Sequence, residues 1–435
     1  MKTTILSFLF QFLAFQIIYA QVWAPLGNGV TAEHKNDYAK VNTFSEDTVN
    51  HLLYVGGDFY YAGDTVSRYL AIWNGIEWHT VESGDISISG PVTGSYMLHD
   101  TVLYSNSHGI GRFHNHKFLE DLPGVGGAVR AFMMYHDTLF AAGSFFGGIK
   151  KYNGKKWEIV GGGVYNAYDL CIYNDQLIVG GSFTEAGDSV AHDIAAWDGN
   201  TWHSLGSGTK YNQFQTSGII EALTVYNNTI IAGGLFDHAG DSTAHYVAQW
   251  DGVTWHPMDG LCDEVVDLFS DGKHGVYACG WFGMNKSGKC AANRVAYWNG
   301  SEWSDLDFGE IDPVFCMNFF DNDLYVGGIF TRAGDVDANH IARLENAIAT
   351  SSPSITHNQT LDFYPNPATD QLHIETPNIH NATVTILNLL GQVVLQQEFS
   401  DNGLFDISNL PKGMYLVNIM DGIGKVLKKG KVVKE

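Results

Sequence analysis

The chain has 435 residues, with 24 Lys and Arg against 47 Asp and Glu, so its formal net charge is −23. A chain this acidic lacks the basic footprint that binds a phosphate backbone, so we expect no nucleic-acid partner. Gly is abundant at 49 residues and aromatic residues make up 13%, while charged residues make up only 16%. This composition is typical of an ordered, turn-rich β protein and excludes a disordered chain.

Residues 1–20 are typical of a secretory signal peptide. Lys2 supplies the positive n-region, Ile5 to Ile18 the mostly apolar h-region, and Ala20 the small residue before the cleavage site. The apolar stretch is short and interrupted by two Gln residues, and no later stretch reaches 18 apolar residues. We therefore expect a chain that is exported to the periplasm, with no transmembrane segment after processing.

Residues 21–346 repeat one pattern. An apolar-apolar-Gly-Gly-x-Phe segment is followed by a loop and then by x-Ala-x-Trp-Asn/Asp-Gly-x-x-Trp, first between Leu53 and Trp78. The copies recur about every 40 to 50 residues, a period typical of β-propeller blades. One copy is eroded: around Leu103 and Phe113 the Gly pair and the Trp are both replaced.

Each copy predicts two β-hairpins. Asn74-Gly75 is a turn dipeptide that suits a two-residue type I′ hairpin, which would set Trp73 opposite Ile76 and place the indoles of Trp73 and Trp78 on one face. Asn-Asp-type turns, such as Asn174-Asp175, predict a second hairpin upstream. Two hairpins give a four-stranded blade, and the paired glycines are expected where backbones approach closely.

The ends of the repeat region complement each other. The last copy stops at Leu344 without its second Trp, and the missing segment stands at the start of the mature chain as Trp23 to Gly27. An N-terminal strand that completes the last blade would remove exposed sheet edges. The fold class is therefore predicted as all-β, a seven-bladed β-propeller closed by an N-terminal strand, with outermost-strand positions at Trp23, Trp78, Phe118, Trp157, Trp202, Trp255 and Trp303.

These repeats resemble a known family. The Gly-Gly pairs followed by spaced aromatic residues are similar to the kelch type of β-propeller. They resemble more closely the Gly-Gly-x-Phe…Trp-Asp-Gly-x-x-Trp repeat proteins that Bacteroidetes secrete. The resemblance covers residues 21–346 and implies a secreted propeller.

A small polar segment, residues 347–360, is predicted to be a linker, and a second module, residues 361–435, follows. This module resembles the type A C-terminal sorting domain of the type IX secretion system, and its short alternating strands predict a small Ig-like β-sandwich. The resemblance implies the type IX machinery as a partner and a location in the medium or on the outer cell surface. It rests on Tyr364, Pro365, Asn366, Pro367, Gly391, Gly413, Tyr415, Lys428 and Lys429.

Candidate ligand-binding residues recur in the loops after the Gly pairs. Ala-Gly-Asp precedes a polar residue in most copies, and such side chains could converge at one mouth of the central channel and bind calcium or a sugar. The alternative is that each Asp caps its own turn, which recurrence in four copies favours. The candidates are Asp64, Arg68, Asp188, His192, Asp241, His245, Arg294, Asp335 and His340.

Two further clusters of side chains are candidates for metal binding, and one cysteine pair is a candidate disulfide. The first cluster consists of His108, His114 and His116, which either bind zinc or copper or are ordinary surface residues. The second consists of Asp263, Glu264 and Asp267, which either form a calcium site or have no metal-binding role. Among the five Cys, Cys279 and Cys290 flank one loop and are the favoured disulfide pair. No cofactor is predicted, although the carboxylates would accept calcium.

No catalytic motif appears: the sequence has no Gly-x-Ser-x-Gly elbow, His-Glu-x-x-His helix or phosphate-binding loop. The predicted function is therefore a binding or adhesion role towards a glycan or protein ligand, without catalysis. The alternative is a carbohydrate-active enzyme with carboxylates at the channel mouth.

Overall fold

The computed structural model describes residues 22–34, 38–81, 88–114, 117–211, 216–270, 274–283, 290–309, 312–345, 347, 363–364, 368–375, 382–388, 393–399, 402–420 and 426–434. The predicted signal peptide and linker thus lie outside the described residues, apart from Ala347. The chain divides into two compact units, residues 1–348 and 349–435. The described parts of both are built from strands alone, and no helix in them is long and apolar enough to cross a membrane.

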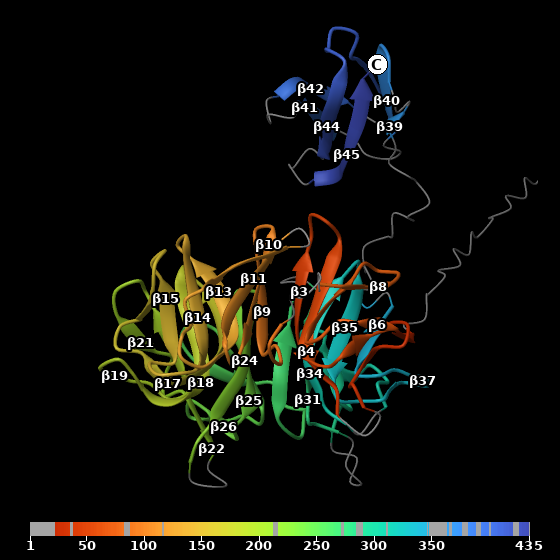
Figure 1. Cartoon of the computed structure of the whole chain (residues 1–435). Coiled ribbons are helices and arrows are strands. Elements are labelled where there is room, and N and C mark those ends of the chain that lie inside the picture. Colours follow the sequence, from red (N-terminus) through yellow and green to blue (C-terminus); the bar gives the residue numbers. More distant parts are fainter. Residues whose placement is uncertain are drawn as a thin grey trace, which may run out of the picture. The chain divides into compact units, whose positions relative to one another are not determined.

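The first unit contains seven sheets that share one plan, in which an edge strand is followed by three antiparallel partners (Figure 1). In chain order the first four sheets are β3 (Lys40–Asp47), β4 (Leu52–Asp58), β7 (Leu70–Trp73) and β8 (Trp78–Thr80); β9 (Gly94–Leu98), β10 (Thr101–Asn106), β11 (Gly109–His114) and β12 (Lys117–Leu122); β13 (Ala128–Tyr135), β14 (Thr138–Ser144), β15 (Ile149–Tyr152) and β16 (Trp157–Ile159); and β17 (Val164–Tyr173), β18 (Gln176–Ala186), β20 (Ile194–Trp197) and β21 (Trp202–Ser204). The other three are β24 (Ile219–Tyr226), β25 (Thr229–Leu235), β28 (Val247–Trp250) and β29 (Trp255–Pro257); β30 (Val265–Phe269), β31 (Val276–Gly280), β32 (Val295–Trp298) and β33 (Trp303–Asp305); and β34 (Val314–Phe320), β35 (Asp323–Gly328), β38 (Ile341–Leu344) and β1 (Trp23–Pro25).

Short strands form small hairpins in the connections: β2 (Val30–Thr31), β5 (Tyr61–Ala62), β6 (Thr65–Val66), β19 (Ser189–Val190), β22 (Thr209–Tyr211), β23 (Thr216–Ser217), β26 (His238–Ala239), β27 (Ser242–Thr243), β36 (Arg332–Ala333) and β37 (Val336–Asp337). Neighbouring sheets meet through their first strands. β3 contacts β9, and the contacts continue through β13, β17, β24 and β30 to β34, which in turn contacts β3.

The upstream turns form the hairpins that the sequence predicts. Asn174 and Asp175 have φ of +48° and +60°, and Tyr173 pairs with Gln176 across them, as in a two-residue type I′ turn. The close approach predicted for the Gly pair is also confirmed. A Cβ on Gly57 would collide with the carbonyl oxygen of Lys40, at the bulge of the neighbouring strand β3.

The turn after Trp73 is longer than predicted. Trp73 pairs with Trp78 and not with Ile76, which is 84% exposed. The cause is the Asn74 side chain, whose Oδ1 accepts the N–H groups of Ile76 and Glu77 at 2.9 and 2.8 Å and so stabilises a four-residue loop. The prediction that the two indoles share a face is confirmed, because their ring centroids lie 5.1 Å apart.

The tryptophans of the outermost strands link each sheet to the one before it. The indole N–H of Trp202 donates to the carbonyl of Gly161 at 3.1 Å, and that of Trp255 donates to Leu205 at 2.9 Å. Equivalent bonds run from Trp78 to Leu26, Trp157 to Pro123 and Trp303 to Met258. The sheet of the eroded repeat has Phe118 here and therefore no donor.

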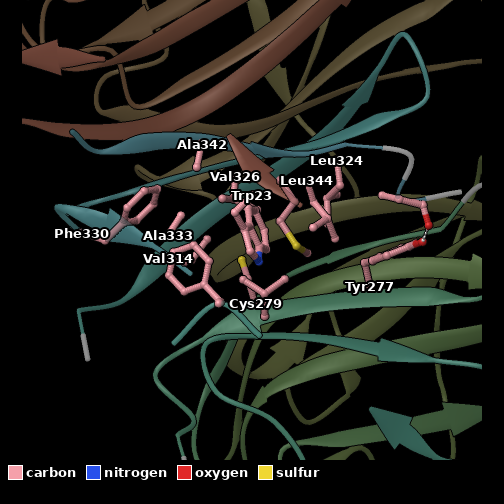
Figure 2. Packing of buried hydrophobic residues seen from close by; sticks show 14 of the residues in the cluster. Trp23, Tyr277, Cys279, Val314, Leu324, Val326, Phe330, Ala333, Ala342 and Leu344 are labelled. Atoms are coloured by element: carbon pink, nitrogen blue, oxygen red, sulfur yellow. Dashed lines mark hydrogen bonds between the residues drawn. The ribbon is translucent and has the colours of Figure 1, made fainter. Parts of the chain in front are cut away.

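The N-terminal strand takes part in the same pattern. Trp23 pairs with Leu344, so β1 is the outermost strand of the sheet that the last repeat forms. Its indole lies among Cys279, Val326 and Leu344 (Figure 2), and its N–H donates to Leu306 at 2.7 Å. The chain's first described strand thus reproduces the contact that the other tryptophans make.

The disulfide prediction is wrong. Cys290 bonds to Cys262, with the Cα atoms 5.2 Å apart, and not to Cys279. Cys279 lies inside β31 with its side chain fully buried in the sheet core, and it is a free thiol with Cys171 and Cys316. The spacing in sequence gave no information on which thiol faces the connecting loop.

The second unit contains two sheets in its described part. One consists of β39 (Phe363–Tyr364), β40 (Gln371–Glu375) and β43 (Asn402–Asp406), and the other of β42 (Val393–Phe399), β41 (Ala382–Leu387), β44 (Gly413–Met420) and β45 (Val426–Lys434). Buried residues of both sheets share one core, including Leu372, Ile374, Val384, Val417 and Ile419.

Replacing a link tryptophan tests this packing. We expect Trp202→Ala to lower the free energy of unfolding by about 3–5 kcal/mol, because it leaves a cavity beside Trp197. Trp202→Phe keeps a ring but strands the Gly161 carbonyl, and should cost about 1–3 kcal/mol. Chemical denaturation of both variants measures the difference, and an unchanged midpoint for the Ala variant would contradict the proposed packing.

Candidate functional site

A cavity of about 570 Å³ lies where the first strands of the sheets meet. It is lined from β3, β13, β17, β24, β30 and β34, so each side is supplied by a different repeat. Its polar lining includes Lys40, Asn42, Thr93, Arg130, Tyr168, Asp169, Glu221 and Asp267. Most of these side chains stand on strands, so the sheet backbone holds them in place.

An ion pair forms part of the lining of this cavity. Arg130 on β13 reaches over the intervening strand β17 to Glu221 on β24, with Nη1 and Oε2 3.0 Å apart. The guanidinium also lies over the ring of Tyr168 on β17, 4.3 Å from its centroid. Burial raises the pKa of Glu221 above its usual value, and Arg130 opposes that shift. The three side chains form one connected group with a positive, a negative and an aromatic part.

Two aspartates in the cavity are tied to backbone amides. Asp169 accepts the N–H of Leu170 at 2.8 Å and that of Leu223 on the next first strand, β24, at 2.7 Å. Asp267 does the same with Leu268 at 2.8 Å and Met317 on β34 at 2.7 Å. Each aspartate follows a bulge in its strand and so points towards its neighbour. These carboxyl groups link adjacent sheets.

Burial raises the pKa values of both groups despite these bonds. The pKa of Asp169 rises to about 7, and that of Asp267 rises to about 8, partly because the Asp169 carboxylate is also nearby. Both groups thus titrate near neutral pH. Chemically, the cavity offers one paired cation, one paired carboxylate, an aromatic ring and two carboxyls whose oxygens already accept backbone N–H groups.

The predicted Ala-Gly-Asp residues lie elsewhere. They form the tips of small hairpins, and Asp64, Asp188, Asp241 and Asp335 are all exposed. The hairpins contact the outermost strands, and Gly63 lies so near the Trp78 indole that a Cβ there would collide with it. None of the four aspartates lines the cavity. The structure therefore does not bring them together at the channel.

The polar partners of these aspartates fall into two groups. Arg294 and His340 directly precede the third strand of their sheets and have φ of +64° and +65°, as do Tyr69, Asp193 and Tyr246 in the other copies. Arg68, His192 and His245 stand one position earlier. In all four copies the aspartate stands six residues before the first residue of the third strand, so His340 lies one position later in its loop than Arg68, His192 and His245 do in theirs.

The individual contacts of these partners are local. Arg68 donates to the hydroxyl of Tyr60 at 2.7 Å, His245 lies 3.6 Å from Asp259, and Arg294 donates to the carbonyl of Trp281. The backbone carbonyl of His192 accepts the N–H of Thr209. Burial lowers the pKa of His340, whose Nδ1 has no hydrogen-bond partner in the described part of the chain.

The described members of the histidine cluster do not form a common site in the structure, and neither do those of the acidic cluster. His114 donates through Nδ1 to the backbone carbonyl of Asp100, His108 is exposed on the turn before β11, and His116 lies outside the described residues. Of the acidic cluster, Asp263 is exposed whereas Asp267 lines the cavity, and the pKa of Glu264 is raised to about 6 by burial. Within the described ranges, no group of three or more His, Cys, Asp or Glu could hold a metal ion.

The sorting-motif residues belong to the second unit. Tyr364 ends β39, Gly413 begins β44, and Lys428 and Lys429 lie in β45. Tyr415 is buried in β44 and its hydroxyl donates to the carbonyl of Pro411 at 2.8 Å. The remaining motif residues, Pro365, Asn366, Pro367 and Gly391, lie outside the described residues.

Sequence reasoning missed Arg130, Tyr168, Asp169 and Glu221. They stand in first strands, which carry no shared motif. A signal was present, since charged residues interrupt otherwise apolar β segments there, and such a residue needs a partner or a cavity.

Comparisons with known proteins bear on both units. Residues 362–434 match the family model "Secretion system C-terminal sorting domain", so the C-terminal segment carries a domain of that kind. Residues 321–346 match the model "Domain of unknown function (DUF5122) beta-propeller". Beta-agarase D of Zobellia galactanivorans is 32% identical over 137 residues, which are 31% of this chain and only 28% of that relative.

Among solved structures, PorZ of Porphyromonas gingivalis is described as a surface component of its type IX secretion system. It has a TM-score of 0.46 and 13% identity, over 90% of this chain and 59% of that one. The β-propeller domain of the Trilobed protease from Pyrococcus furiosus has a TM-score of 0.47 and 9% identity, over 71% and 96% of the two chains.

The raised pKa values predict a pH effect on stability. Asp267 keeps its proton in the folded state up to about pH 8, whereas the unfolded chain releases it near the usual value of 3.8. The folded state therefore binds more protons between these limits, and stability should fall as the pH rises from 5 to 8. Asp267→Asn removes this contribution, so its denaturation midpoint should change less than that of the wild type over the same range. An equal slope in both proteins would refute the assignment.

Proposed function

We propose that this protein is a secreted or cell-surface β-propeller that binds a glycan or protein ligand in the axial cavity and is not an enzyme. One observation carries the proposal. The axial cavity is the one of about 570 Å³ that lies where the first strands of the sheets meet; it is within the size range of small-molecule sites and is lined by Arg130, Glu221 and Tyr168 as one connected group.

The chemistry of this group suits recognition. The Arg130 guanidinium has further N–H donors beyond the one facing Glu221, and the Tyr168 ring gives an apolar surface. A sugar hydroxyl can accept a hydrogen bond from the Arg130 guanidinium while the C–H face of the sugar ring packs against the Tyr168 ring. Asp169 and Asp267 are engaged by backbone N–H groups, which argues for a structural and not a catalytic role for them.

The finer points of the architecture belong to the same proposal. We infer that the seven four-stranded sheets are the blades of one kelch-like propeller, since their first strands contact one another in a continuous cycle. Pairing of β1 with β38 would then close the ring. The second unit would be an Ig-like sandwich, supported by the single core between its two sheets.

The route of export follows from the tail. The match of residues 362–434 to a sorting domain supports handling by the type IX secretion machinery, with entry to the periplasm through the predicted signal peptide. The product would be released into the medium or displayed on the outer surface.

A second candidate is a carbohydrate-active enzyme, which the partial similarity to an agarase favours. In that case Glu221 would serve as a catalytic carboxylate, since its raised pKa suits a general acid. Its pairing with Arg130 argues against this, because the ion pair favours the ionised form.

Binding and turnover can be separated in one experiment. The purified chain is incubated with agar, cellulose and other insoluble polysaccharides, and both retention and released sugar are measured. We expect retention without product and at least a tenfold weaker affinity for Arg130→Met, which loses a charged donor. Arg332→Met, at an exposed residue on β36, is the matched control and should bind like the wild type. Release of product would support the enzyme instead, and equal binding by both variants would remove the cavity as the site.

Export can be tested by truncation. Deleting residues 361–435 should trap the protein in the periplasm of its host, because the sorting domain is what the outer-membrane machinery recognises. Fractionation followed by immunoblotting measures the distribution. Normal appearance of the truncated protein in the medium would defeat the assignment.

A further inference from the structure

The sheet of the eroded repeat, β9 to β12, differs from the others at one cross-strand pair. Tyr104 on β10 pairs with Gly111 on β11. The same register holds Val55 opposite Ala71 in the first sheet and Val179 opposite Ala195 in the fourth. A small aliphatic pair is therefore replaced by a large aromatic residue that faces a residue without a side chain.

This exchange is a matched substitution. The end of the Tyr104 ring lies directly over Gly111, where a Cβ would collide with it. The outermost strand carries Phe118 in place of Trp, and the rings of Tyr104 and Phe118 lie edge to face with centroids 6.3 Å apart. Since phenylalanine is smaller than tryptophan, the space that an indole fills in other sheets is partly empty here.

A cavity of about 350 Å³ occupies this position. Besides the two rings, its lining includes Asn106, His108, Asp121 and Ser89, and no Lys or Arg among the residues that the structure describes. It shares no residue with the axial cavity. It therefore combines apolar rings with several hydrogen-bonding groups, the mixture that small-molecule sites typically show.

The polar groups of this cavity are partly uncommitted. Most of Tyr104 is buried, but its side chain lines the cavity and its hydroxyl is not enclosed. Burial and the nearby Asp121 carboxylate raise the pKa of Tyr104, so this hydroxyl stays protonated and is a donor at neutral pH. Asn106 uses its Oδ1 for the N–H groups of His108 and Gly109, which fixes the side chain in place. The Tyr104 hydroxyl keeps contact with the open space of the cavity, so it can donate to a ligand or to water there.

We propose that this cavity is a second binding site, for one neutral sugar ring of a polysaccharide. The C–H face of a sugar ring packs against aromatic carbon, its hydroxyls accept from Tyr104 and donate to Asp121, and its lack of charge matches a lining without Lys or Arg. An anionic sugar finds no counter-charge here. The site is independent of the axial cavity, so each can fail without the other.

The test uses two neutral probes, the β-1,4-linked tetrasaccharide of glucose and a tetrasaccharide of agarose, in calorimetric titration of the full chain. We expect saturable binding of at least one. Tyr104→Phe, which keeps the ring and removes the hydroxyl, and Asp121→Asn should each weaken that binding about threefold to tenfold, the value of one hydrogen bond. Glu120→Gln, the next residue on β12 but outside the lining, is the matched control and should bind like the wild type.

Three outcomes would overturn the proposal. Neither tetrasaccharide binds; or one binds but Tyr104→Phe and Asp121→Asn leave the affinity unchanged; or choline, a cationic probe for an aromatic and acidic pocket, binds in their place and is weakened by the same variants. Asp121 is exposed, so its variant folds even if the Tyr104 variant does not. Arg130→Met should weaken only the binding at the axial cavity and leave intact the binding that Tyr104→Phe and Asp121→Asn weaken, which separates the two sites.

Discussion

The repeated indole hydrogen bond between neighbouring sheets is the interaction on which the rest of the first unit depends. A four-stranded sheet cannot bury both of its faces alone, and here six of the seven sheets are tied to their predecessors by a tryptophan whose N–H donates to a backbone carbonyl. The bond fixes the angle between sheets because both donor and acceptor are rigid. Trp23 makes the same bond to Leu306, so a strand from the start of the chain packs like those encoded in the repeats.

This constraint explains where variation is tolerated. Positions that serve packing, such as the glycine opposite the bulge or the tryptophan after the turn, recur in nearly every copy. The first strands face the axis, where copies do not pack against an identical environment, and there Arg130, Tyr168 and Glu221 differ from their equivalents. The eroded repeat is the other place of variation. The axial cavity and the cavity beside Tyr104 therefore lie where the repeat pattern is least regular.

The recurrent Ala-Gly-Asp loops show the converse. Charged residues recur in these loops, which suggests a binding site. Their hairpins, however, contact the outermost strands, and Gly63 packs against Trp78. Their regularity reflects the shared packing of this loop on its indole. By contrast, Asp169 and Asp267, which bridge neighbouring sheets through backbone amides, belong to no repeated motif and could not be recognised as equivalent.

The sequence by itself determined the all-β class, the repeated hairpins, the shared face of the paired indoles, the N-terminal segment as partner of the last repeat and the sorting tail. These depend on local turn chemistry and on periodicity, which neighbouring residues encode. The tertiary structure alone decided that Cys262 bonds to Cys290, that Trp73 pairs with Trp78 and that Arg130 on β13 meets Glu221 on β24. Each of these contacts depends on a one-residue register or on the juxtaposition of distant strands, and a shift of one residue turns a side chain to the opposite face of a sheet.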